Sequence, residues 1–378
     1  MPLPPLSLYI HLPWCERKCP YCDFNSHESS NVPEQAYIAA LLKDLDADLT
    51  LTAGRQIQTL FIGGGTPSLF SAESISQLLQ ALGERLDLAP GMEATMEANP
   101  GSAEADKFLG FRQAGINRLS LGIQSFQDEK LRALGRVHNS EQARAAIDYA
   151  QVAGFDSFNI DLMHGLPGQT EADAAYDLET AISFKPPHLS WYQLTIEPNT
   201  VFNKRPPTLP VEDALADIQD QGELLLGQQG YTQYEVSAYS RADRQCRHNL
   251  NYWSFGDYLA LGAGAHGKIT SGDGSIKRYA KTRAPQDYLQ GKNYTTSTRT
   301  LSREEIIGEF MLFALRLNDG FSTQRFEHVT GLPAEELGNR TQSLVDRKLL
   351  SSEAGNIRAT ALGRRFLDSV IAEFLPSD

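Results

Sequence analysis

The chain has 378 residues, with 34 basic and 47 acidic side chains and a formal net charge of −13. Such an acidic chain is a poor candidate for general nucleic-acid binding, because neutralising phosphates requires a basic surface. Three of its four cysteines lie between residues 15 and 22, which argues against a disulfide scaffold and for a reducing compartment. The first residues lack signal-peptide features and no apolar run is long enough for a membrane span. We therefore expect a cytoplasmic protein, with peripheral membrane contact left open.

Short apolar runs alternate with longer amphipathic stretches over the first 230 residues. These runs predict six β-strands, at 6–11, 59–62, 93–97, 118–124, 155–161 and 188–194. Helical spacing fills the gaps, most clearly over 33–52 and from Ser71 onward. Repeated strand–helix units favour parallel strands, and six units are fewer than the eight of a closed barrel. The sequence therefore predicts an α/β fold whose first domain, 1–230, is a partial (β/α)6 TIM-like barrel. A doubly wound open sheet is the alternative.

The pattern changes after Tyr231. A strand is predicted over 231–236, and the stretch 241–268 is rich in Tyr, Trp, His, Asn and Gly, so we treat 231–300 as a connecting region. Further along, the sequence predicts a helix at 302–317 with a capping box from Ser302 to Glu305, helices at 323–329 and 335–347, a hairpin at 349–360 and a closing helix at 361–374. Residues 301–378 therefore predict a C-terminal α+β domain that is winged-helix-like. Such a domain either binds nucleic acid or serves as a packing or partner-binding module, and the overall acidity of the chain favours the second role.

The cysteine loop, Cys15 to Cys22, carries the clearest chemical signal. Its thiols are spaced C-x3-C-x2-C, and the remaining cysteine, Cys246, is far downstream. Thiolates select zinc, copper(I) or iron–sulfur clusters. A structural zinc takes four protein ligands, whereas three cysteines on a four-iron cluster leave one iron open to a small chelating molecule. The three-cysteine loop therefore favours an iron–sulfur cluster with an exchangeable ligand.

Candidate partners for that cluster follow the ends of the predicted strands. The glycine run at 63–67 follows one strand, and it is either a tight turn or a place where the backbone approaches a ligand closely. Glu97, Gln124 and Asp161 fall at the ends of three others. Because chemistry in such barrels gathers at the carboxyl ends of the strands, we expect these residues to share a site with the cysteines.

A second signature is the segment 247–253, Arg-His-Asn-Leu-Asn-Tyr-Trp. Histidine is a common haem-iron ligand and aromatic side chains pack against porphyrins, so the segment is a candidate haem site. The alternative is a satisfied core histidine beside ordinary packing aromatics. The glycine-rich stretch 262–267, which contains His266, indicates a tight turn.

The cysteine spacing, with Tyr21 directly before the third cysteine, resembles the radical S-adenosylmethionine (SAM) superfamily. That resemblance implies a [4Fe-4S] cluster on Cys15, Cys19 and Cys22, SAM on the open iron, and a partial barrel. Within the superfamily, the chain is similar to oxygen-independent coproporphyrinogen III oxidase. The residues that match its SAM-binding positions are Tyr9, Gly64, Gly65, Thr66, Glu97, Gln124, Arg136 and Asp161, and Tyr21 matches a contact to a second SAM molecule.

Two features depart from the oxidase. Phe24 stands where the oxidase has a further cysteine, and the oxidase's long N-terminal segment has no counterpart before Cys15. Together with the His-Asn-x-x-Tyr-Trp motif, these features resemble the haem chaperone family HemW. The motif residues implied to contact haem are His248, Asn249, Tyr252 and Trp253. The resemblance implies that haem is bound and transferred to acceptor proteins, respiratory membrane enzymes among them, and it leaves a homodimer open. The alternative is the oxidase itself or a related radical SAM enzyme of porphyrin metabolism.

Overall fold

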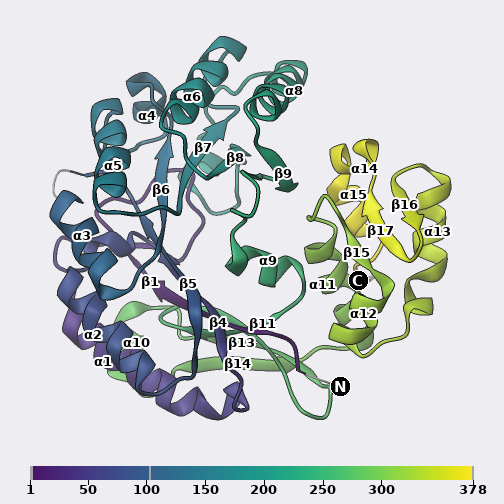
Figure 1. Cartoon of the computed structure of the whole chain (residues 1–378), viewed down its shortest axis with the longest axis horizontal. Coiled ribbons are helices and arrows are strands. Elements are labelled where there is room, and N and C mark those ends of the chain that lie inside the picture. The colour runs from purple at the N-terminus through teal and green to yellow at the C-terminus, as the bar shows by residue number, and fades with distance from the viewer. Residues whose placement is uncertain (1–2, 102–103, 377–378) are drawn as a thin grey trace.

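The computed structural model describes residues 3–101 and 104–376, and its largest element is a twelve-stranded sheet. Figure 1 shows this sheet curving into a partial barrel, with helices outside it and the C-terminal domain beside its open side. The strands that the sequence predicts for the barrel are present as parallel neighbours, and they are β1 (Leu6–Leu12), β4 (Ile57–Gly64), β5 (Leu88–Ala98), β6 (Arg118–Gln124), β7 (Phe158–His164) and β8 (His188–Gln193). The predicted partial barrel is therefore confirmed.

The connecting helices lie on the outside of the barrel and bury one face against the strands (Figure 1). They are α1 (Glu34–Asp48), α2 (Ala72–Gly83), α3 (Glu104–Ala114), α4 (Asp128–Ala133), α5 (Ser140–Val152), α6 (Glu171–Ser183), α7 (Val201–Lys204) and α8 (Glu212–Gln228). Side-chain caps begin several of them; Ser71, for example, accepts a hydrogen bond from the Ser74 amide at the start of α2. The predicted helix at 33–52 was too long, because α1 ends at Asp48 and a 3-10 turn, η1 (Leu49–Thr52), follows.

Residues 231–300 supply both edges of the sheet. At one edge, β10 (Ala238–Ser240) pairs antiparallel with β8, and β9 (Thr232–Glu235) follows it. At the other edge, β11 (Asp257–Leu261) pairs parallel with β1, and β12 (His266–Thr270), β13 (Ile276–Lys281) and β14 (Thr295–Thr300) continue antiparallel. Two short helices connect these strands, α9 (Arg247–Trp253) and α10 (Pro285–Gln290). Figure 1 shows α9 at the open side, facing the C-terminal domain.

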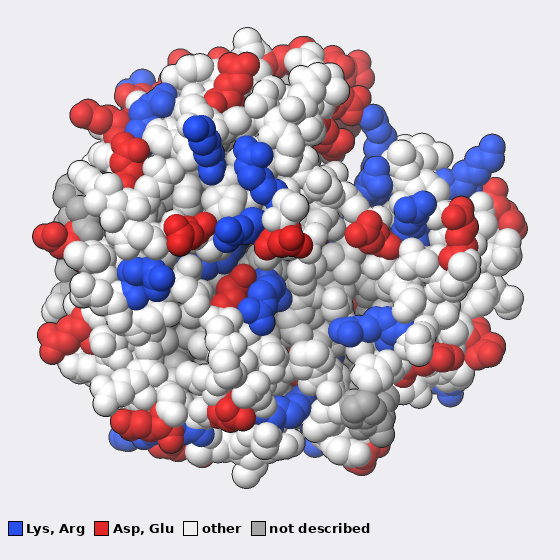
Figure 2. All heavy atoms as spheres, in the orientation of Figure 1, with Lys and Arg blue, Asp and Glu red and all other residues white. Residues whose placement is uncertain are grey.

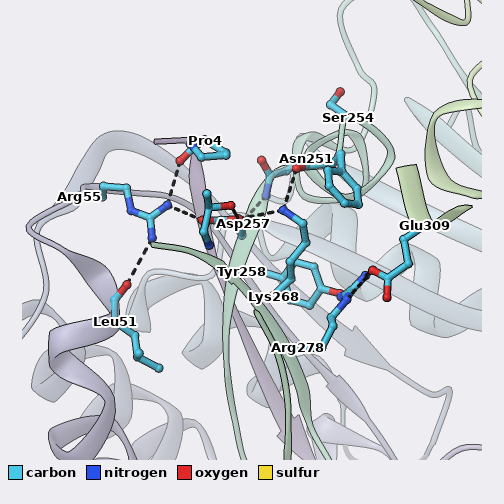
Figure 3. A network of polar contacts seen from close by, with 12 residues as sticks. Pro4, Leu51, Arg55, Asn251, Ser254, Asp257, Tyr258, Lys268, Arg278 and Glu309 are labelled. Carbon is cyan, nitrogen blue, oxygen red and sulfur yellow. Dashed lines mark hydrogen bonds and ion pairs between the residues drawn. The ribbon is translucent and has the colours of Figure 1, made fainter. Parts of the chain in front are cut away.

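The start of β11 is held by a buried ion network around Asp257. Figure 3 shows its carboxylate between Arg55 and Lys268, which approach to 2.6 and 2.9 Å. The backbone amide of Thr270 donates a third hydrogen bond at 2.8 Å. The strands were predicted from short apolar runs. Because β11 is short and begins with a charged residue, its sequence does not match that pattern, and the strand was not predicted. The network stabilises the junction of β1, β11 and β12.

The C-terminal domain has its own hydrophobic core. Helix α11 (Arg303–Ala314) begins with the predicted capping box of Ser302 and Glu305. The remaining elements are β15 (Phe321–Ser322), α12 (Thr323–Thr330), η3 (Ala334–Leu337), α13 (Gly338–Asp346), β16 (Leu350–Glu353), β17 (Asn356–Ala359), α14 (Ala361–Arg365) and α15 (Leu367–Ala372). Two predicted single helices are divided: η3 precedes α13, and Phe366, with a non-helical backbone, separates α14 from α15. Helices with a small antiparallel sheet match the predicted winged-helix-like arrangement.

Charge is unevenly distributed over the surface. Figure 2 shows acidic side chains crowding the region of α8, whereas Lys and Arg lie among carboxylates near the middle of the same face. The acidic residues of α8 are Glu212, Asp213, Asp217, Asp220 and Glu223. Among the described residues, no helix combines the length and apolarity that crossing a bilayer requires.

Candidate functional site

The cysteine loop is closed at its base by a small parallel ladder. Cys15 lies in β2 (Trp14–Cys15), which pairs with β3 (His27–Glu28). Cys15 is buried and Cys19 and Cys22 are partly exposed, and all three are free thiols. They line a cavity of about 330 Å³, here called the cysteine cavity, whose opposite wall includes Glu97 and Asp161. Burial raises the pKa of the Cys15 and Cys22 thiols, so bound metal rather than the protein must favour their thiolate forms.

The glycine run enters the cysteine cavity under tight steric limits. Gly64 has φ = +121°, and a Cβ on Gly65 would stand 2.4 Å from the carbonyl oxygen of Trp14. Both glycines are therefore required by packing against the chain itself. The same loop brings Gly64, Gly65 and Thr66 to the cavity wall, and the Gly64 amide donates a 3.0 Å hydrogen bond to Glu97 Oε2. The tight-turn and ligand-approach interpretations of this loop are compatible.

Two partly buried carboxyl groups line the cysteine cavity. Glu97 lies near the end of β5, and burial, with a smaller effect of Asp161, raises its pKa to about 7. Asp161 was predicted at a strand end but lies in the middle of β7, because the strand runs from 158 to 164. Its carboxylate accepts hydrogen bonds from Ser120 at 2.9 Å and Asn159 at 2.7 Å. Two carboxyl groups that line one cavity favour a cationic ligand.

Gln124 and Arg136 also line the cysteine cavity. Gln124 ends β6 with φ = +70°, a costly conformation for a residue other than glycine, and accepts a 2.8 Å hydrogen bond from the Tyr192 hydroxyl. Arg136 donates to Asn99 Oδ1 at 2.6 Å, and its Nη1 lies 3.5 Å from Cys19 Sγ. Asn99 also donates to Thr66 at 2.8 Å. No sequence signal selects Asn99, since Asn-Pro-Gly indicates only the end of a strand.

A second cavity, here called the aromatic cavity, adjoins the first. It measures about 830 Å³ and is lined by residues that include Tyr252, Tyr258, Phe313 and His266. Four residues line both cavities, namely Phe24, Gly64, Glu97 and Trp253. Of the other predicted site residues, Tyr21 and Asn249 line the cysteine cavity, whereas Tyr9 lines the aromatic cavity. Apart from His248, the predicted SAM and haem residues thus converge on two cavities that share lining residues.

His248 is placed differently from the rest of its motif. Its side chain is fully buried and lines neither cavity. Nδ1 lies 2.8 Å from Thr59 Oγ1, and Nε2 lies 2.9 Å from the Tyr252 hydroxyl oxygen. Burial, with a smaller effect of Arg118, lowers its pKa to about 3, so the ring is neutral. In this structure both ring nitrogens have protein partners, as in the core-histidine interpretation.

Known proteins resemble this chain in sequence and in fold. Residues 9–181 match the Radical SAM superfamily, and residues 301–366 match the HemN C-terminal domain. The chain is 50% identical to "Heme chaperone HemW" of Haemophilus influenzae, over 100% of this chain and 99% of that relative. The chain belongs to the HemW family of the radical SAM superfamily. It is also 50% identical to the HemW chaperone of Escherichia coli, over 99% of both chains.

A solved relative supports the fold over the whole chain. The coproporphyrinogen III oxidase HemN of Escherichia coli, a radical SAM enzyme, superposes with a TM-score of 0.83 at 26% identity. The match covers 99% of this chain and 91% of the oxidase. The C-terminal domain is therefore shared with the oxidase as well as the barrel.

The superfamily implies a [4Fe-4S] cluster and SAM, and the cysteine cavity fits both. Three free thiols on one loop supply three of the four ligands that a cubane requires. Among the described residues, no three His, Cys, Asp or Glu side chains gather closely enough for a single metal ion, whereas a cubane asks for one thiolate on each of three irons. Glu97 and Asp161 provide the negative wall that a sulfonium ligand favours.

Proposed function

We propose that this protein is a haem chaperone: it binds haem in the aromatic cavity and transfers it intact to haem-accepting proteins. The acceptors in this proposal include respiratory membrane enzymes, reached from the cytoplasm. The cluster is held by Cys15, Cys19 and Cys22. SAM lies in the cysteine cavity against the glycine loop, in contact with Tyr21, Thr66, Glu97, Gln124, Arg136 and Asp161, with Tyr9 behind the shared wall.

The observation that carries the proposal is the aromatic cavity beside the cysteine cavity. Its volume of about 830 Å³ lies in the range of sites that enclose large organic ligands. Its wall combines aromatic side chains with the cationic Arg283, which suits a flat apolar ring carrying carboxylates. The full-length relatives at 50% identity, whose names describe haem chaperones, support the same cargo.

Phe24 separates this function from that of the oxidase. Its side chain is 61% exposed and lines both cavities. A large apolar ring at this place cannot supply the further thiol that the oxidase family carries there, and it adds apolar surface for a porphyrin. When bound, a reduced cluster with SAM supplies one-electron chemistry. In the proposed chaperone, residues of the cysteine cavity serve to bind and orient SAM.

The test uses the full chain, reconstituted anaerobically with iron and sulfide. We expect haem titration to produce a Soret band that saturates near one haem per chain. We expect no conversion of coproporphyrinogen III to protoporphyrinogen IX with SAM and a reductant, while the Escherichia coli oxidase, assayed in parallel, converts it. Absence of saturable haem binding would overturn the proposal, and turnover of coproporphyrinogen would replace it with the oxidase function.

A further inference from the structure

The chain has eight histidines, and their exposure decides which of them could bind a haem iron. The side chains of five are buried, those of His11, His138, His164, His188 and His248. His27 is partly buried and lies 3.3 Å from Asn25 Oδ1. The two exposed ones are His266 and His328, and His328 lies on α12 in the C-terminal domain. His266 is therefore the exposed histidine that lines a cavity large enough for haem.

His266 is held in place by a glycine-rich turn. It begins β12 and pairs with Ala280 of β13. Gly262 and Gly264 have φ of +100° and +82°, and a Cβ on Gly264 would stand 2.2 Å from the Asn25 side chain. Both glycines allow the turn to pack tightly against the cysteine loop. Among the residues that the structure describes, none forms a hydrogen bond with the His266 ring, which is exposed and lines the aromatic cavity.

The groups around His266 suit a porphyrin. Trp253 and Phe313 pack with ring centroids 5.9 Å apart, and both line the aromatic cavity. The Trp253 Nε1 is buried and has no hydrogen-bond partner in the described part of the chain. The exposed guanidinium of Arg283 also lines the cavity. The cavity thus offers an imidazole, aromatic surface and a cation, which match the iron, the ring and a propionate of haem.

We propose that His266 is the axial haem-iron ligand of this chain and that His248 is a positioning residue, which acts through Tyr252. This inference rests on the proposed haem function and assigns its ligand. A neutral ring nitrogen of His266 donates its lone pair to the iron, and no electron is transferred in that step. Partial burial and the nearby Arg278 and Arg283 lower the pKa of His266, so its ring is neutral near pH 7.

His248 contributes through Tyr252. The 2.9 Å contact between His248 Nε2 and the Tyr252 hydroxyl fixes that phenol ring, which lines the aromatic cavity. Tyr252 in turn packs edge-on against Tyr258, another lining residue, with centroids 4.4 Å apart. Loss of His248 therefore loosens the wall of the cavity without removing the iron ligand.

The experiment compares His266→Ala, His248→Gln and the exposed control His328→Ala, each as the full chain reconstituted with its cluster. Haem titration gives affinity, and the ferric Soret position with electron paramagnetic resonance gives the axial ligand. Far-ultraviolet circular dichroism and cluster absorbance report folding. We expect His266→Ala to lose the imidazole signature and at least 10-fold in affinity, with the signature restored by added imidazole. We expect His248→Gln to bind more weakly with an unchanged signature, and His328→Ala to match the wild type.

The outcomes distinguish the two proposals. If the His266→Ala variant bound haem with the affinity of the wild type and kept the imidazole signature, the ligand assignment would be overturned. The chaperone proposal would still stand. Loss of the imidazole signature in folded His248→Gln, with its retention in His266→Ala, would also overturn it and assign His248 instead. Failure of the wild type to bind haem would overturn the proposed function and this inference with it.

Discussion

The Nε2 atom of His248 lies 2.9 Å from the hydroxyl oxygen of Tyr252, and the His248 side chain is fully buried. Its other nitrogen lies 2.8 Å from Thr59 Oγ1, which in turn lies 2.7 Å from Ser7 Oγ. A polar chain thus runs from β1 through β4 to α9, inside the barrel. The ring joins the barrel wall to the helix that borders both cavities.

His248→Ala should destabilise the protein. The substitution leaves a cavity and removes a hydrogen-bond partner from the buried Thr59 hydroxyl and from the partly buried Tyr252 hydroxyl, which together cost about 2–4 kcal/mol. Tyr252→Phe removes only one hydrogen bond and should cost about 1 kcal/mol. Denaturation by urea, followed by circular dichroism, measures both changes. Equal stability of His248→Ala and the wild type would contradict the structural role of the ring.

The cluster should depend on Cys19 and not on Cys246. Cys19→Ser removes one of three thiolates, so the visible absorbance and the iron content after reconstitution should be lost. Cys246 is buried at the start of α9, its Sγ lies 3.7 Å from Glu93 Oε1, and it lines neither cavity. Cys246→Ser is therefore the matched control and should keep both signals. Loss of the cluster in the control would refute a three-cysteine site.

Glu97 should make the stability of the cluster-free, SAM-free protein pH-dependent. Its pKa of about 7 in the folded state exceeds its ordinary value of 4.5, so the folded state holds a proton that the unfolded chain releases between these values. The free energy of unfolding therefore falls as pH rises through this window, by up to about 3 kcal/mol.

Glu97→Gln removes this titration, and its amide oxygen still accepts from the Gly64 amide. Thermal melts are measured from pH 5 to 8.5. The melting temperature of the variant minus that of the wild type should rise with pH and become constant above about pH 7.5. A difference in melting temperature that does not change with pH would show that Glu97 is already ionised in the folded protein.

Asp257→Asn tests the ion network at the start of β11 (Figure 3). The Lys268 side chain is fully buried, and without the carboxylate its charge has no counterion there, which costs about 3–5 kcal/mol. The exposed pair of Arg347 and Glu373, 2.8 Å apart, is the control, and Arg347→Ala should cost less than about 1 kcal/mol. Chemical denaturation measures both. Similar small effects would mean that the network does not secure β11.

The sequence predicted the barrel well because its signals are local. In the short run Arg118–Gln124, for example, Leu119, Leu121 and Ile123 recur at every second position, and the observed strand has the same limits. At the sheet edges, the strand predicted at 231–236 is present as β9, whereas β10 and the strands β11 to β14 were not predicted. The stability of β11 comes from distant partners, because its Asp257 pairs with Arg55 and Lys268. No local pattern marks such a strand.

The candidate site also has a part that local sequence predicts and a part that depends on the fold. Cys15, Cys19 and Cys22 could be selected as candidate cluster ligands because one loop carries all three. The sequence also selected the motif that begins at His248, but it could not show that the ring is buried while His266, 18 positions further along, is exposed beside a cavity. That difference depends on how α9 packs against β4 and β11 and on how β12 pairs with β11, which only the folded chain reveals.

The most direct test of the chaperone account is the rate at which bound haem moves to an acceptor. Haem-loaded protein is mixed anaerobically with increasing amounts of respiratory membranes from haem-deficient cells, and with apomyoglobin as a passive scavenger. Transfer through a complex predicts a rate that rises with membrane concentration and exceeds the rate of capture by apomyoglobin. Identical rates that do not depend on acceptor concentration would mean that haem simply dissociates, and would contradict the chaperone account.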